Sequence, residues 1–147
     1  MKSLGMKLRF SVTKNEFSGT FQTISSNLNE SFKLLSLALN KNKFPEDEIE
    51  KVRNQIIAGI RFKESDISSL SSKLFDQGFY KMHKFSRPID GTLDSLKSIK
   101  EEDLKSFKND NFSLANLIIG VSGNINSSDL LKGLDLVFGK FHETKLS

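Results

Sequence analysis

The chain has 147 residues, of which 37% are hydrophobic and 27% charged, and this balance is typical of one globular domain and excludes a disordered chain. It contains no cysteine, which excludes disulfides, thiolate metal sites and a cysteine nucleophile. The formal net charge is +4, but the lysines are spread along the chain, and no run approaches the roughly 18 apolar residues of a membrane span. We therefore expect neither a nucleic-acid partner nor a membrane span.

The first 25 residues predict a β-hairpin. Two segments alternate apolar and polar residues with the period of a half-buried strand, and the polar residues 14–16 separate them. The alternating positions are Met6, Leu8, Phe10 and Val12 in the first segment, and Phe17, Gly19 and Phe21 in the second. We expect the two strands to pair antiparallel.

Two amphipathic helices are predicted next. The first begins near Asn27, and its apolar face consists of Leu28, Phe32, Leu35 and Leu39. The second covers residues 45–62 and begins with a proline and three acidic residues, which suit the first turn of a helix. Its predicted buried stripe includes Ile49 and Val52.

A third helix and a loop follow. Ser65 or Asp66 could cap this helix, which is predicted to end near Gly78. Its predicted apolar face consists of Ile67, Leu70, Leu74 and Phe75. Residues 81–92 have the polar and turn-forming composition of an exposed loop.

The last part of the chain predicts two short helices, a buried strand and a final helix. The short helices cover residues 93–99 and 101–109, and the apolar run 114–121 predicts the strand. The final helix begins at Ser127 or Ser128. Its apolar residues are Leu130, Leu131, Leu134, Val137 and Phe138.

These elements predict an α+β fold in which helices pack on one face of an antiparallel sheet. Three strands leave at least one sheet edge without a cover, and such edges are normally protected. We therefore interpret residues 1–147 as a single but incomplete domain.

The order of four segments resembles the pitrilysin-type zinc metallopeptidases, also called inverzincins. These segments are FPEDEIEKVR at 44–53, RPIDGTLDSL at 87–96, the pair Asp103-Leu104, and NLIIGVSGN at 116–124. The similarity extends over nearly the whole chain. It implies an α+β domain of the kind that forms half of such a peptidase, as in a bacterial zinc-protease-like protein.

In active members of this family, two histidines of an HxxEH helix and a glutamate from a later helix bind zinc. The chain contains two histidines, His83 and His142, which are 59 positions apart and not in an HxxEH motif. The resemblance aligns the later helix with residues 45–62, where Gly59 occupies the ligand position and Val52 the position of the second glutamate. Neither residue can donate an oxygen, so no zinc or other cofactor is expected in this chain. For His83, a hydrogen bond to the loop backbone is the expected role.

The resemblance also implies a partner. Family members pair an active with an inactive half around a peptide, so this chain is interpreted as part of an inactive half, bound to a homologous catalytic subunit or to a second copy of itself. The peptide or partner is expected at the hairpin edge, through Leu8, Phe10, Val12, Phe17 and Phe21. The residue usage suggests a bacterial protein, and its compartment stays open between periplasm or envelope and cytoplasm.

Two other hypotheses remain. The chain could be a fragment of an active zinc metalloendopeptidase whose HxxEH motif lies upstream, with the third ligand supplied elsewhere. A weaker hypothesis, based on charge alone, is a binder of nucleic acid or another anionic surface, for which steep salt dependence would be diagnostic.

Overall fold

The computed structural model describes residues 5–41 and 43–143. Their contacts divide them into two compact units, which are described separately. The first unit contains the residues before 12, the segment 18–43 and the residues from 105 onward; the second contains segments 12–17 and 44–104. Among the described residues, no helix is both long and apolar enough to cross a membrane.

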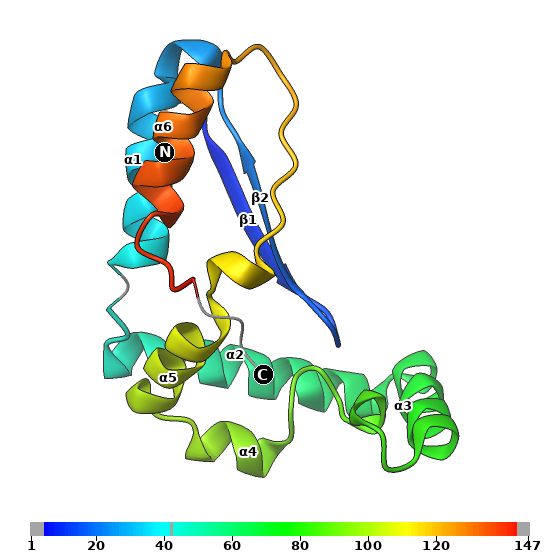
Figure 1. Cartoon of the computed structure of the whole chain (residues 1–147). Coiled ribbons are helices and arrows are strands. Elements are labelled where there is room, and N and C mark those ends of the chain that lie inside the picture. Colours follow the sequence, from blue (N-terminus) through cyan, green and yellow to red (C-terminus); the bar gives the residue numbers. More distant parts are fainter. Residues whose placement is uncertain (1–4, 42, 144–147) are drawn as a thin grey trace. The chain divides into compact units, whose positions relative to one another are not determined.

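The fold is α+β, as the sequence predicts. Strands β1 (Lys7–Val12) and β2 (Phe17–Gln22) form an antiparallel hairpin (Figure 1). The helices are α1 (Leu28–Asn40), α2 (Glu46–Ser65), α3 (Ile67–Tyr80), α4 (Leu93–Ser98), α5 (Glu101–Asn111) and α6 (Ser127–Phe138). Short 3-10 helices in the described segments are η2 (Ser25–Asn27), η3 (Lys84–Ser86) and η4 (Leu114–Asn116).

The core of the first unit lies where α1 and α6 pack side by side (Figure 1). It consists of Phe32, Leu35, Leu39 and Val137, and Val137 has no exposed surface. Leu8 and Phe21 of the hairpin pack against this cluster, so the two helices cover one face of the sheet. The Phe21 ring centroid lies 5.7 Å from that of Phe32.

Side-chain hydrogen bonds fix the carboxyl end of α6 to α1. The Ser36 hydroxyl donates to the carbonyl of Leu136 at 2.8 Å, and the Asn40 amide donates to the carbonyl of Val137 at 2.8 Å. The last carbonyls of a helix have no partner within the helix. Ser36 and Asn40 therefore provide hydrogen-bond partners for two of the last carbonyls of α6 and hold the two helices in register.

The second unit is built from α2, α3 and α4. Asp66 caps α3, because its carboxylate accepts a hydrogen bond from the backbone N–H of Ser69 at 2.8 Å. Hydrogen bonds from the Ser69 side chain and backbone lower the pKa of Asp66 below its ordinary value of 3.8. Arg53 of α2 donates to the carbonyl of Leu96 in α4 at 2.8 Å and also to that of Ile99.

The hairpin turn is bound to α3 and η3 within this unit. Lys14 pairs with Asp76 and donates to the carbonyl of Phe85. Its ammonium also lies 5.6 Å from the centroid of the Tyr80 ring, at cation–π distance. Three contacts from one lysine therefore hold residues 12–17 in place.

The prediction of a strand at residues 114–121 is wrong. Residues Leu114–Asn116 form η4, and residues 117–122 have no regular structure, although Leu117 is extended. A strand needs a neighbour that accepts its backbone hydrogen bonds, and β1 and β2 pair only with each other in the part of the chain that the structure describes. Ile118 is 96% exposed as a result.

The predicted burial of α2 and α3 is also wrong in part. Ile49 is buried as expected, but Val52 is 49% exposed. On α3, every residue of the predicted apolar face is exposed: Ile67 by 82%, Leu70 by 44%, Leu74 by 60% and Phe75 by 62%. The half-buried residues of this helix are instead Ser69, Asp76 and Tyr80. Its polar side is therefore packed and its apolar side is open.

Candidate functional site

The two ligand-equivalent positions lie on the exposed side of α2. Gly59 is exposed, and a Cβ added there would meet nothing within 4 Å. Val52, which lies two helical turns earlier, is half exposed. Neither side chain carries an oxygen, so these positions cannot hold a metal. Their alignment with the family's glutamates stays a prediction.

The neighbouring carboxylates of α2 have other partners. Glu50 pairs with Arg53, and Glu48 pairs with Lys51 at 2.8 Å. Across residues 5–41 and 43–143, no group of three or more histidine, aspartate or glutamate side chains could hold a metal ion. Glu50 therefore serves an ion pair on the helix surface.

The two histidines lie in different units and have local roles. Nδ1 of His83 accepts a hydrogen bond from the backbone N–H of Phe85 at 3.3 Å, and the two rings meet edge to face at 4.8 Å. This agrees with the expected role of a loop histidine bonded to the backbone. The carbonyl of His142 accepts hydrogen bonds from the backbone N–H of Leu114 at 2.7 Å and from the Ser113 hydroxyl at 3.0 Å.

The five residues predicted for the hairpin edge divide into two groups. Leu8 and Phe21 are half-buried against the helical core. Phe10, Val12 and Phe17 are exposed by 45%, 59% and 49%. The sheet has two strands among the described residues, so each strand has one edge that β-pairing does not cover. The second group alone provides an accessible apolar surface.

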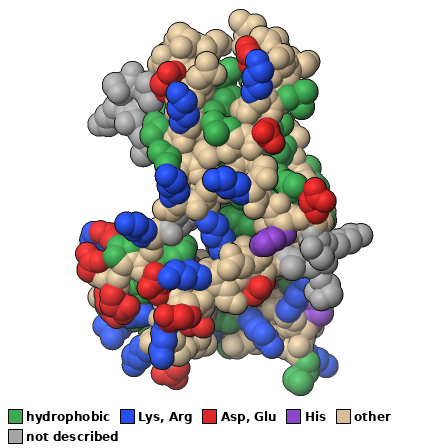
Figure 2. All heavy atoms as spheres, turned by 60° about the vertical axis from the view of Figure 1, so that its left-hand side comes forward, with side chains coloured by type: hydrophobic (Ala, Val, Ile, Leu, Met, Phe, Trp, Pro, Cys, Tyr) green, Lys and Arg blue, Asp and Glu red, His purple; other side chains and the backbone are tan. Residues whose placement is uncertain are grey.

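Charges of both signs are mixed on the face that Figure 2 shows, where lysines and arginines alternate with aspartates and glutamates. Neutralisation of many phosphates requires a basic surface of one sign. The absence of a nucleic-acid partner stays a prediction.

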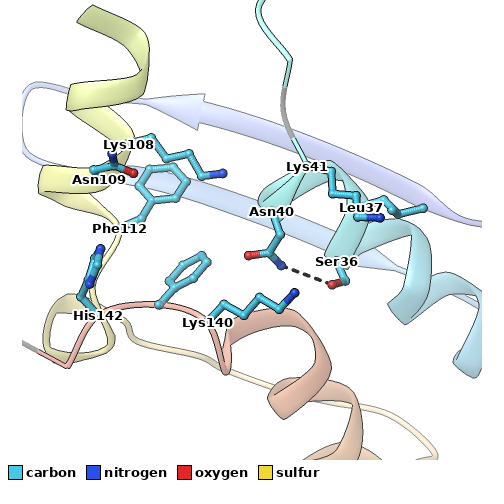
Figure 3. Close-up of a pocket in the computed structure, with 10 residues that line it drawn as sticks. Ser36, Leu37, Asn40, Lys41, Lys108, Asn109, Phe112, Lys140 and His142 are labelled. Atoms are coloured by element: carbon cyan, nitrogen blue, oxygen red, sulfur yellow. Dashed lines mark hydrogen bonds between the residues drawn. The ribbon is translucent and has the colours of Figure 1, made fainter. Parts of the chain in front are cut away.

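One pocket was missed by the sequence reasoning. It has a volume of about 250 Å³ and lies in the first unit, between the carboxyl ends of α1 and α5 and the residues that follow α6 (Figure 3). Three of its lining residues are lysines, Lys41, Lys108 and Lys140. They come from three distant segments, so no local motif could have identified the pocket.

Comparison with family models gives no match. In sequence, the chain is similar to an uncharacterized zinc protease of Rickettsia felis, with 24% identity over 86% of this chain and 31% of the relative. It is equally similar to the non-peptidase homolog YmxG of Helicobacter pylori, with 24% identity over 92% of this chain and 31% of that protein. It is 25% identical to mitochondrial-processing peptidase subunit beta of Dictyostelium discoideum, over 100% of this chain and 31% of the subunit. The chain thus spans about a third of the length of these relatives.

Two solved structures share its fold. A peptidase M16 inactive domain from Pseudomonas fluorescens matches 99% of this chain and 36% of that chain, with a TM-score of 0.92 and 21% identity. A protease from Helicobacter pylori matches the same shares with a TM-score of 0.77 and 20% identity.

The resemblance to the pitrilysin-type family is therefore confirmed, in sequence by the zinc-protease relatives and in fold by the inactive domain.

Proposed function

We propose that this chain is part of a non-catalytic half of a pitrilysin-type peptidase, which closes a peptide-binding chamber together with a homologous catalytic subunit. The fold of an inactive peptidase domain supports the non-catalytic role, and the similarity to a named subunit of mitochondrial-processing peptidase supports the pairing. The lack of a side-chain oxygen at Gly59 and Val52 agrees with the non-catalytic role.

The observation that carries the proposal is the exposed apolar surface of the hairpin. Phe10, Val12 and Phe17 are each about half exposed on two strands that both have an open edge. An extended peptide can add to such an edge through its backbone, while its side chains contact the apolar residues. A partner subunit would protect the same surface from aggregation.

The first prediction concerns self-association. Because Phe10, Val12 and Phe17 expose apolar surface to solvent on the hairpin, we expect a dimer or larger species by light scattering coupled to gel filtration. A Phe10→Lys/Val12→Lys variant should shift the chain toward monomer, because a charge on an edge strand opposes edge-to-edge pairing. Phe75→Lys, on the exposed face of α3 outside the hairpin, is the matched control and should leave the assembly unchanged. A monodisperse wild-type monomer would contradict this prediction.

The second prediction concerns metal. The purified chain, stripped by mild chelation and then supplied with zinc, is expected to hold well below one zinc per chain by elemental analysis. The physical reason is that zinc sites need three or four closely placed donors, and the described residues offer no such group. One tightly bound zinc per chain would overturn the alignment of Gly59 and would favour the hypothesis of an active peptidase fragment.

A further inference from the structure

We propose that the pocket between α1, α5 and the residues after α6 binds a peptide carboxylate, with an apolar peptide side chain beside it. This deepens the proposed function, on which it rests for the identity of the ligand as a peptide. The polar and charged lining provides the anion contact, and two aromatic rings provide the apolar contact.

The pocket is cationic. Lys41, Lys108 and Lys140 line it together with His142, and no aspartate or glutamate does (Figure 3). No ion pair joins these three lysines to a carboxylate in the stretches that the structure describes. Lys108 is also half-buried, so its charge is less screened than that of a fully exposed lysine. Several lysines around one hollow give it a positive potential that attracts an anion.

The helix ends explain part of this charge but not all of it. Helices α1, α5 and α6 end at Asn40, Asn111 and Phe138, and residues at or next to these three carboxyl ends line the pocket. Each end carries about half a negative elementary charge, and a lysine nearby is favourable for that reason alone. The three lysines carry about three positive elementary charges and the three helix ends about 1.5 negative ones, which leaves an excess of about 1.5 positive charges. The excess is what a ligand carboxylate would neutralise.

The walls are held in place before any ligand binds. Asn40 Nδ2 donates to the Ser36 hydroxyl at 3.2 Å and to the Val137 carbonyl at 2.8 Å, which fixes the α1 side (Figure 3). On the opposite side, the backbone N–H of Leu114 donates to the carbonyl of His142 at 2.7 Å. A preorganised site loses less entropy on binding.

The apolar contact comes from two packed rings. The ring centroids of Phe112 and Phe141 lie 5.8 Å apart, and Phe141 meets Phe138 edge to face at 5.4 Å. A volume of about 250 Å³ is below the range of about 300–1,000 Å³ for drug-sized ligands. The pocket therefore suits a single peptide terminus or side chain and is too small for a larger cofactor.

The test uses the whole chain and a fluorescent tetrapeptide, Ala-Ala-Leu-Phe, labelled at its amino end and prepared as the free acid and as the C-terminal amide. We expect the free acid to bind at least about tenfold more tightly than the amide by fluorescence polarisation, because charge-assisted hydrogen bonds to a carboxylate are worth that much. The side-chain amide signals of Asn40 and Asn109, which also line the pocket, should shift on binding. A second peptide with an internal aspartate and an amidated end tests whether a side-chain carboxylate binds as well as a terminal one. Binding of this peptide adds to the proposal only if the free acid also binds more tightly than its amide.

The variants separate binding from stability. The Lys108→Gln/Lys140→Gln variant should bind the free-acid peptide about tenfold or more weakly than the wild-type chain does. Lys132→Gln, an exposed lysine of α6 outside the pocket, should change affinity by less than about twofold. Equal binding of acid and amide, equal effects of pocket and control variants, or no binding of any of the peptides would overturn the proposal. These outcomes leave the hairpin test intact, because its variants do not line the pocket.

Discussion

Replacement of Gly133 by alanine is expected to destabilise the chain by about 1–3 kcal/mol, the usual cost of overpacking a core. A Cβ added at Gly133 would lie 2.4 Å from Cε2 of Phe32 and 2.6 Å from two further ring atoms. The Phe32 ring cannot move aside easily, because it is 94% buried and belongs to the core between α1 and α6. Glycine at this position therefore sets how closely the two helices approach.

The matched control is Gly59→Ala on α2, which makes the same chemical change at an exposed helical position. A Cβ there meets nothing within 4 Å, so the only effect is the gain in helix propensity, about 0.5–1 kcal/mol of stabilisation. In urea denaturation, the free energy of unfolding should therefore fall for Gly133→Ala and rise for Gly59→Ala. If Gly133→Ala proves neutral, α1 and α6 do not approach as closely as described. A Gly133→Ala/Phe32→Leu double variant should recover part of the loss, because it removes the clashing ring.

The helices could be predicted because their signals are local. Caps, acidic first turns and apolar periodicity located α1, α2 and α6 within a few residues. The close approach at Gly133 could not be predicted, because its reason is the Phe32 ring, about a hundred positions earlier in the chain. Local patterns specify which face of a helix is apolar, and they leave the neighbouring element undetermined.

The same limit explains the two errors of burial and strand assignment. The apolar run at 114–121 has the composition of a strand, but a strand forms only where a neighbour accepts its hydrogen bonds. The apolar face of α3 likewise has the pattern of a core face, but Lys14 binds Asp76 on the opposite side of the helix. Both predictions fail at residues whose expected partners are not supplied by the described chain.

For the candidate site, the sequence correctly predicted the two strands of the hairpin, while the alignment of Gly59 and Val52 with the family's glutamates and the role of the hairpin edge stay predictions. It did not predict the pocket. In the sequence, Lys108 lies in a predicted helix that carries charges of both signs. Lys41 and Lys140 join it at the pocket only through the packing of α1 and α6. A cluster built from three segments is a property of the tertiary structure.

The second large effect is expected from Arg53→Lys, although it preserves the charge. The Arg53 side chain is 11% exposed, and it donates to two carbonyls at the end of α4 while it pairs with Glu50. A guanidinium presents several donors in a planar fork, whereas a lysine ammonium is a compact charge that cannot reach all three partners. At least one carbonyl would lose a charge-assisted hydrogen bond, which costs about 1.5–3 kcal/mol.

Arg61→Lys provides the comparison, because Arg61 lies exposed on the same helix and the change is chemically identical. Surface substitutions of this kind usually change the free energy of unfolding by no more than about 0.5 kcal/mol. Hydrogen exchange should resolve the mechanism, since Arg53→Lys is expected to increase exchange in α4 while α1 and α6, which make none of these contacts, keep their protection. Equal and small effects of the two variants would mean that Arg53 acts as an ordinary solvated arginine and that α4 is held by other contacts. A large effect confined to Arg53→Lys would show that the Arg53 side chain of α2 has a structural role, because it binds α4.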